Sequence, residues 1–200
     1  MGEPLLDFGE VMRRLRAECP WKAEQTHRSL ARYLLEETHE TIEAIDTGDP
    51  DHLREELGDL LLQVYFHAVI AEESGAFTLD DVARGITEKM LRRNPHVFGA
   101  PEGTAPMDAA AVNDAWQEIK AAEKAREHVT DGLPPTLPAL LHADKVLDRL
   151  AREGAPVVLP PTGDDADLGD RLLGLVAEAR AADRDPEQAL RDAVRRLLER

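Results

Sequence analysis

Residues 35–64 read LEETHETIEAIDTGDPDHLREELGDLLLQV, and this stretch decides the fold. Apolar residues recur at helical spacing on both sides of its centre, which is typical of two amphipathic helices. Between them, Gly48 suits the left-handed position after a helix, while Asp49 and Pro50 suit the N-cap and first residue of the next one. The pattern predicts two antiparallel helices joined by a short turn, which is an αα-hairpin.

Two pairs of acidic residues stand at matched distances from this turn. Glu40 and Glu56 are equally far from Gly48 in the sequence, and so are Glu37 and Asp59. With a rise of ~1.5 Å per residue, the four carboxylates are expected to converge about 12 to 16 Å from the hairpin tip. Like charges this close oppose folding unless a cation neutralises them, and carboxylate oxygens without cysteine suit Mg²⁺ or Mn²⁺. We therefore interpret the four residues as candidate metal ligands.

A solvated acidic face is the alternative interpretation. Glu is common on exposed helix surfaces, and the chain has 40 acidic residues. Two features favour the metal site: the pairs match across the turn, and Glu56 and Asp59 lie within or beside the apolar run 57–70, where a helix usually faces a core.

The same residues resemble the signature of the MazG family of nucleoside triphosphate pyrophosphohydrolases, which is Glu-Glu-x-x-Glu followed by Glu-x-x-Asp. Further blocks of the family occur in order at residues 19–30, 88–99, 116–120 and 133–140, so that the resemblance covers residues 5–142. Two positions depart from the family pattern. Lys22 stands where Asp is usual, and Asn94 stands where His is usual.

The resemblance implies an all-α fold, a MazG-like helical bundle assembled as a homodimer or a higher homo-oligomer. It also implies Mg²⁺-dependent hydrolysis of nucleoside triphosphates to monophosphates and pyrophosphate, with Mn²⁺ as a possible substitute, in nucleotide-pool housekeeping. By the resemblance, Glu37, Glu40, Glu56 and Asp59 correspond to the Mg²⁺ ligands. Glu36 belongs to the family's Glu-Glu pair and is the candidate for orienting or deprotonating the attacking water; a solvated side chain is the alternative.

Candidate substrate contacts lie outside the hairpin turn. Lys89, Arg92 and Arg93 share one helical turn and could offset the charge of departing pyrophosphate, although basic residues late in a helix also complement its dipole. Aromatic side chains could contact base or ribose, or could belong to the core. They are Trp21, Tyr33 and Trp116.

The overall charge restricts the partners. A net charge of −16 argues against binding to nucleic acid or an anionic membrane, since such binding needs Lys and Arg against phosphate. An anionic nucleotide remains compatible because a bound metal reverses the local field. The single Cys19, the lack of a signal peptide pattern and the short longest apolar stretch predict a cytoplasmic protein without a membrane span.

The rest of the sequence predicts further helices and a domain boundary. Helices are expected near residues 5–18, 28–46, 50–73, 78–93, 108–128, 138–152, 166–182 and 186–199, with a loop at 94–107. We interpret residues 1–130 as a MazG-like catalytic domain and residues 131–138 as a Pro-rich linker.

Residues 139–200 are interpreted as a shortened, degenerate second copy. The run Asp167–Leu173 aligns with Glu56–Leu62, but the Pro/Gly-rich stretch 154–163 replaces the helix that would carry the first carboxylate pair. Chance similarity between Leu- and Arg-rich helices is the alternative. For the whole chain, the contrasting hypothesis is a catalytically silent helical interaction module with a vestigial metal site.

Overall fold

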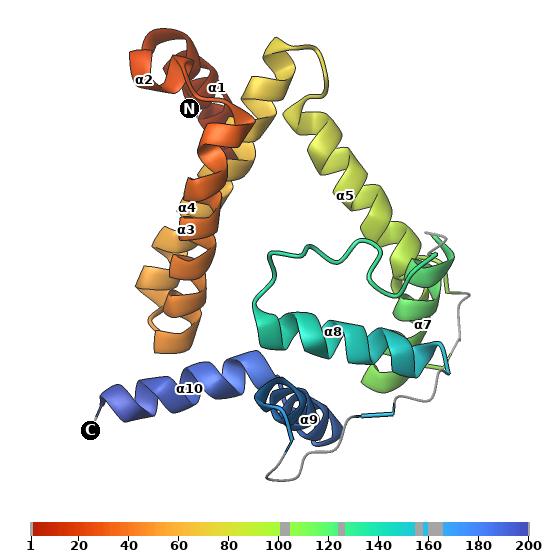
Figure 1. The fold of residues 1–200 in the computed structure, drawn as a ribbon. Coiled ribbons are helices and arrows are strands. Elements are labelled where there is room, and N and C mark those ends of the chain that lie inside the picture. The colour runs from red at the N-terminus through yellow and green to blue at the C-terminus, as the bar shows by residue number, and fades with distance from the viewer. Residues whose placement is uncertain (1, 101–104, 124–126, 155–157, 160–165, 200) are drawn as a thin grey trace. The chain divides into compact units, whose positions relative to one another are not determined.

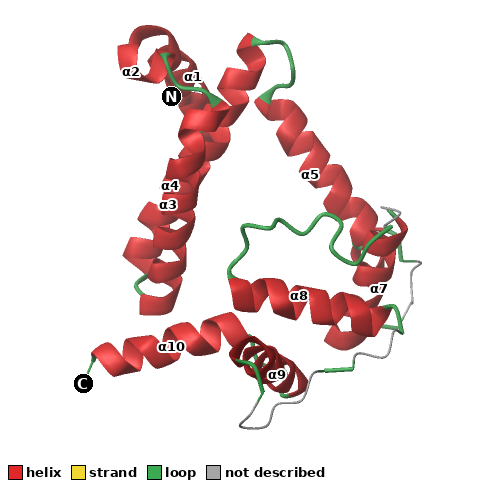
Figure 2. Cartoon of the chain, viewed as in Figure 1, coloured by secondary structure: helices red, strands yellow, loops and turns green. Residues whose placement is uncertain are grey.

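The computed structural model describes residues 2–100, 105–123, 127–154, 158–159 and 166–199. These residues form helices, turns and loops without any strand (Figure 2), which confirms the predicted all-α class. The chain divides into two compact units, Met1–Ile119 and Lys120–Arg200, and each is described by itself. Among the described residues, no helix is both long enough and apolar enough to span a membrane.

The predicted helices are present with small shifts at their ends (Figure 1). The prediction of a helix over 108–128 was wrong at its end, because the helix ends at Ala122 and residues 123, 127 and 128 form a turn and bends; residues 124–126 lie outside the described residues. Two four-residue helices were not predicted because one turn shows no periodicity, and one of them falls in the predicted loop 94–107. The elements are α1 (Pro4–Glu18), α2 (Pro20–Ala23), α3 (His27–Thr47), α4 (Pro50–Glu73), α5 (Leu79–Arg93), α6 (Pro95–Phe98), α7 (Ala109–Ala122), α8 (Ala139–Arg152), α9 (Leu168–Ala181) and α10 (Pro186–Leu198).

The α3–α4 hairpin has the predicted turn. Gly48 ends α3 with φ 73°, a left-handed conformation that glycine adopts without a Cβ penalty. Asp49 then caps α4, because its side chain accepts a hydrogen bond from the backbone N–H of Asp51 at 2.9 Å, and Pro50 follows at the first helical position. The two helices run antiparallel, side by side (Figure 1), so residues equally far from the turn lie at similar heights.

The hydrophobic core of the first unit lies in the half of the hairpin away from the turn. Met12 of α1, Leu30 of α3 and Phe66 of α4 are each only 1% exposed and belong to one buried cluster. Two ion pairs join α1 to the end of α4. Arg13 contacts Glu72 at 2.9 Å, and Arg16 contacts Glu73 at 2.7 Å. The hairpin is therefore anchored at the end opposite its tip, and the candidate metal ligands lie between the core and the tip.

Helix α5 packs differently from α3 and α4. It contacts α4 next to the loop that joins them and then diverges from the hairpin (Figure 1). None of its residues is buried in the chain. Its exposed apolar side chains are Val82, Ile86, Met90 and Leu91.

In the second unit, α8, α9 and α10 pack against one another. Leu147 and Val176 are buried there, and Arg180 of α9 donates hydrogen bonds to Asp144 and Asp148 of α8. Asp167, which the repeat alignment pairs with Glu56, is the N-cap of α9 rather than a residue within a helix. The unit begins at Lys120, so residues expected to end the first domain and to form the linker belong to this unit. The interpretation as a degenerate second copy stays a prediction.

Candidate active site

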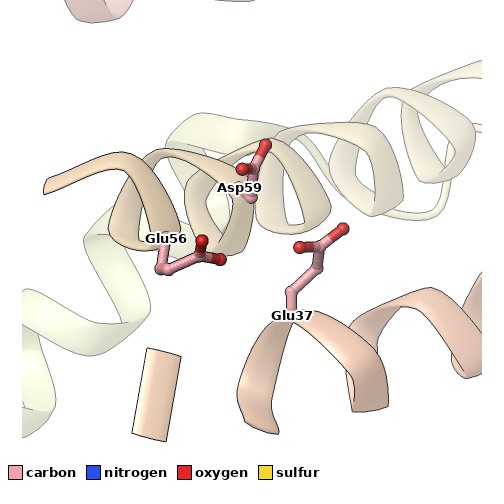
Figure 3. Close-up of side chains that lie close together, drawn as sticks. All are labelled: Glu37, Glu56 and Asp59. Carbon is pink, nitrogen blue, oxygen red and sulfur yellow. The ribbon is translucent and has the colours of Figure 1, made fainter. Parts of the chain in front are cut away.

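Three of the four predicted ligands form one carboxylate cluster. Glu37 of α3 faces Glu56 and Asp59 of α4 (Figure 3), and one oxygen from each residue lies within 4.8 Å of the others. All three side chains are half-buried. The matched spacing about Gly48 therefore brings carboxylates of both helices together, as the sequence predicts.

Glu40 joins the cluster electrostatically. Burial raises the pKa of the Glu37 carboxyl above its ordinary value, and the charges of Asp59, Glu40 and Glu56 raise it further. Glu40 also accepts a hydrogen bond from the protonated form of Glu37, although Glu40 itself is exposed. The charges of Asp59, Glu40 and Glu56 thus all act on the Glu37 carboxyl, and this repulsion opposes its full ionisation.

Two neighbours of the cluster were not singled out from the sequence. His52 Nε2 lies 3.2 Å from Glu56 Oε1, and the Glu56 side chain is only 12% exposed. The spacing of four residues between them on α4 was the available signal. Thr41 is buried between the helices and donates a hydrogen bond from Oγ1 to the Glu37 carbonyl at 2.8 Å. These contacts fix the backbone and side chains on which the cluster depends.

The aromatic candidates on the hairpin side lie together. Trp21 of α2 and Tyr33 of α3 make an edge contact with ring centroids 5.9 Å apart. Tyr33 also packs against the buried core cluster, whereas Trp21 is 49% exposed. The Lys22 Nζ atom lies 5.5 Å from the Trp21 ring centre and 5.2 Å from that of Phe66. Tyr33 is thus partly a core residue, and Trp21 keeps an accessible ring.

The basic candidates lie on the diverging helix α5. Lys89 and Arg92 are exposed, and Arg93 is half-buried with its guanidinium 5.2 Å from the ring centre of Trp116 on α7. Helix α5 diverges from the α3–α4 hairpin beyond the loop that joins it to α4 (Figure 1). The carboxylate cluster belongs to the hairpin, whereas the basic candidates belong to α5. Glu36 is exposed on α3, one turn before Glu40.

Residues 25–98 match the domain described as MazG nucleotide pyrophosphohydrolase domain. The chain is also 38% identical over 213 residues to the nucleoside triphosphate pyrophosphohydrolase/pyrophosphatase MazG of Thermotoga maritima, covering 95% of this chain and 81% of that protein. The chain belongs to the MazG family. The three carboxylates of the cluster and Glu40 lie inside the matched residues 25–98.

Two further comparisons give the extent of the similarity to MazG proteins. A nucleoside triphosphate pyrophosphohydrolase of Mycobacterium tuberculosis is 44% identical, with 100% of this chain and 57% of that protein covered. A crystal structure of a mazG-related protein from Thermotoga maritima has 26% identity and a TM-score of 0.48, with 58% of this chain and 96% of that chain covered.

Proposed function

We propose that this MazG chain is a Mg²⁺-dependent nucleoside triphosphate pyrophosphohydrolase that releases a monophosphate and pyrophosphate, in nucleotide-pool housekeeping. The observation that carries the proposal is the convergence of Glu37, Glu56 and Asp59 within 4.8 Å, with Glu40 acting on the same volume. The names of the relatives from Thermotoga maritima and Mycobacterium tuberculosis support the reaction type.

The residues of the cluster fit a hard divalent cation. They offer only carboxylate oxygens, which Mg²⁺ and Mn²⁺ prefer. Burial and the charges of Asp59, Glu40 and Glu56 raise the pKa of Glu37, so a bound cation would relieve the repulsion within the group. Glu37, Glu40, Glu56 and Asp59 would hold the ion, which would bind phosphate oxygens and lower the pKa of an attacking water.

The protein's own residues would then position and activate that water. We assign Glu36 to orienting or deprotonating it, because a carboxylate beside the ligands and exposed to solvent can accept a proton from a bound water. His52 would keep Glu56 in place through its 3.2 Å contact. Without the cation, an anionic triphosphate would be repelled by the cluster, since like charges lie close together.

The departing pyrophosphate needs positive charge, which Lys89, Arg92 and Arg93 can supply. Because α5 diverges from the hairpin of its own chain and carries an uncovered apolar face, we propose that two chains associate as a homodimer. We propose that in this dimer the basic side chains serve a carboxylate cluster. Trp21, Tyr33 and Trp116 are proposed to contact the base or the ribose.

A cytoplasmic location is part of the proposal, because a reducing compartment would keep the free Cys19 as a thiol. A catalytically silent interaction module is the second candidate. It is favoured by Lys22 and Asn94, which occupy positions where the family usually has Asp and His.

A panel of canonical and modified nucleoside triphosphates, incubated with Mg²⁺ or Mn²⁺ and analysed for released pyrophosphate, separates the two candidates. We expect pyrophosphate release from at least one member of the panel. Binding without turnover of any member would favour the silent module.

A further inference from the structure

Lys22 of α2 has no anionic partner among the residues that the structure describes. The residue is half-buried, and its Nζ atom makes no ion pair or hydrogen bond with any of them. Other basic side chains of the first unit pair with carboxylates, namely those of Arg13, Arg14, Arg16, Arg54 and Arg84. An ammonium group has three N–H donors and no acceptor. In a chain with 40 acidic and 24 basic residues, the donors of Lys22 therefore stay available to an acceptor of a ligand.

Aromatic rings hold this ammonium group in place. The Nζ atom lies 5.5 Å from the ring centre of Trp21 and 5.2 Å from that of Phe66. The faces of aromatic rings attract cations, so both contacts favour this position of the side chain. Phe66 is only 1% exposed and belongs to the core, whereas Trp21 is 49% exposed. The ammonium group therefore lies at the edge of the core, beside a ring that a ligand can reach.

The backbone that carries Lys22 is also fixed. Arg16 of α1 donates hydrogen bonds from Nη1 to the carbonyl of Lys22 and, at 2.9 Å, to that of Gln25. The same guanidinium pairs with Glu73 of α4 at 2.7 Å, and the Gln25 amide donates to the Trp21 carbonyl at 2.9 Å. These contacts attach the four-residue helix α2 to α1 and α4. A side chain positioned before binding loses less entropy when a ligand arrives.

The ammonium group lies over the face of α4 that carries Asp59. Phe66 follows Asp59 by seven residues, or about two helical turns, so both lie on one face about 10 Å apart along the axis. Helix α2 lies at the end of the hairpin opposite the turn (Figure 1), so Lys22 is on the side of the cluster away from the tip. The span is comparable with an extended nucleotide, measured from its α-phosphate to the far edge of its base.

The rings of Tyr33 and Trp21 link the surroundings of the cluster to Lys22. Tyr33 precedes Glu37 by four residues and therefore lies one turn from the cluster on the same face of α3. Its ring makes an edge contact with Trp21, with ring centroids 5.9 Å apart, and Trp21 in turn contacts Lys22. A nucleotide whose phosphates are held at the carboxylates would thus meet the rings first and the ammonium group last.

We propose that Lys22 recognises the keto oxygen of a nucleobase and selects triphosphates with guanine-, hypoxanthine- or uracil-type bases. Its ammonium group donates a hydrogen bond to the carbonyl oxygen at position 6 of a purine or position 4 of a pyrimidine. Adenine and cytosine carry an amino group there, which is itself a donor and leaves the ammonium group without a partner. This inference rests on the proposed function, since it needs a nucleotide whose phosphates are held at the carboxylates.

The test compares full-length wild type with Lys22→Met, which keeps an unbranched stem against the rings and removes the charge and its donors. The probes are triphosphates with a non-hydrolysable α,β-methylene linkage, titrated in Mg²⁺ by calorimetry. Guanosine is compared with 2-aminopurine riboside, which lacks the 6-oxygen, and uridine with cytidine. A phosphate oxygen is the other acceptor that a nucleotide offers, and inorganic triphosphate is the probe for it. Lys145→Met, at an exposed lysine of α8, is the control because it makes the same change of side chain and charge.

In wild type, we expect the keto member of each pair to bind about tenfold more tightly than its partner, the effect of one hydrogen bond. In Lys22→Met this ratio should fall to about one because the keto member binds more weakly. Lys22→Arg, which restores a charged donor, and Lys145→Met should keep the preference. Inorganic triphosphate should bind equally to all four proteins. Circular dichroism checks the fold, and Lys22→Leu replaces an unfolded Lys22→Met with the same expected loss.

Two results would overturn the inference while leaving the proposed function intact. One is a ratio that is the same in wild type and Lys22→Met, and the other is an equal loss of affinity for keto and amino members, with or without inorganic triphosphate. Absence of nucleotide binding to wild type would overturn the inference together with the proposed function. A ratio that depends on Lys22, without pyrophosphate release from ordinary triphosphates, would sustain the inference while the proposed reaction failed.

Discussion

Replacement of Glu37 by Gln should have opposite effects on stability without and with metal. The side chain is half-buried, and its carboxylate lies within 4.8 Å of those of Glu56 and Asp59. At that distance the repulsion between two unit charges is roughly 1 kcal/mol in water and about 3 kcal/mol at the effective dielectric of a protein surface. Because the cluster is partly open to solvent, we take the lower part of this range. Metal-free Glu37→Gln should then be about 1 to 2 kcal/mol more stable than wild type near pH 7.

The pH dependence of this difference follows from the raised pKa of Glu37. The carboxyl of Glu37 keeps its proton to higher pH in the folded chain than in the unfolded chain, where its pKa is near 4.5. The ionisation of Glu37 therefore lowers wild-type stability as pH rises from the unfolded pKa through the folded one. The advantage of Glu37→Gln should grow over that window and disappear in acid, where both chains carry a neutral group.

Urea unfolding followed by tryptophan fluorescence measures this prediction, because Trp21 and Trp116 both lie in the first unit and report on it. With Mg²⁺ at a hundred times its dissociation constant, the free energy of unfolding of wild type should rise by about 2.7 kcal/mol, and that of the variant should rise by less. Glu55→Gln, an exposed residue of α4 outside the cluster, is the control. A metal-free Glu37→Gln no more stable than wild type, with the same gain from Mg²⁺, would refute the reasoning.

Three further predictions test the ligands, the turn and the tail. Asp59→Asn and Glu40→Gln should each weaken Mg²⁺ binding and turnover at least ~100-fold, since even the residues that support metal ligands contribute about 10- to 100-fold. Calorimetry measures the binding, and binding constants and rates equal to those of wild type would contradict this prediction. Gly48→Ala should lower the free energy of unfolding by about 1 kcal/mol or more, because φ at this position is 73°. Gly58→Ala should raise it by up to ~1 kcal/mol, because the added Cβ inside α4 meets open space. Equal urea midpoints for the two variants would count against the turn assignment. Asp167→Ala should remove the N-cap of α9 and destabilise that helix by about 1 kcal/mol, which is measured as faster hydrogen exchange in α9. The rate of turnover should not change, and a slower rate would show that the tail contributes to the site.

The hairpin and its carboxylates were predictable because they depend on local rules. Gly48, Asp49 and Pro50 specify the turn, and the fixed rise of a helix then places Glu37 opposite Asp59. No tertiary contact was needed for this step. The exposure of Glu40 was not predictable, because it depends on how far each side chain tilts out of the interface.

The missed features depend on contacts between distant segments. Glu72 accepts two hydrogen bonds from Arg13 of α1, a contact that no spacing rule reveals. Gln63 lies in a run of apolar residues, and its burial at 3% exposure follows from the packing of α4 rather than from its own residue type. Likewise, the divergence of α5 from the hairpin depends on the loop before it.

The same limit applies to the end of the first unit. The Pro-rich composition of residues 131–138 predicts a linker, which stays a prediction, and Arg149 of α8 donates hydrogen bonds to the carbonyls of Val129 and Asp131. These bonds attach the segment to the second unit. Composition indicates where a helix cannot continue, but it does not show which neighbour a loop contacts.

The most direct test of the central claim is a ³¹P NMR time course of nucleoside triphosphate hydrolysis by the full-length protein. We predict no reaction before Mg²⁺ is added. After addition, monophosphate and pyrophosphate should form in equal amounts without diphosphate, and Asp59→Asn should form neither. Diphosphate with orthophosphate as products, or undiminished hydrolysis by Asp59→Asn, would contradict the assignment of the α3–α4 carboxylates as the metal site of a pyrophosphohydrolase.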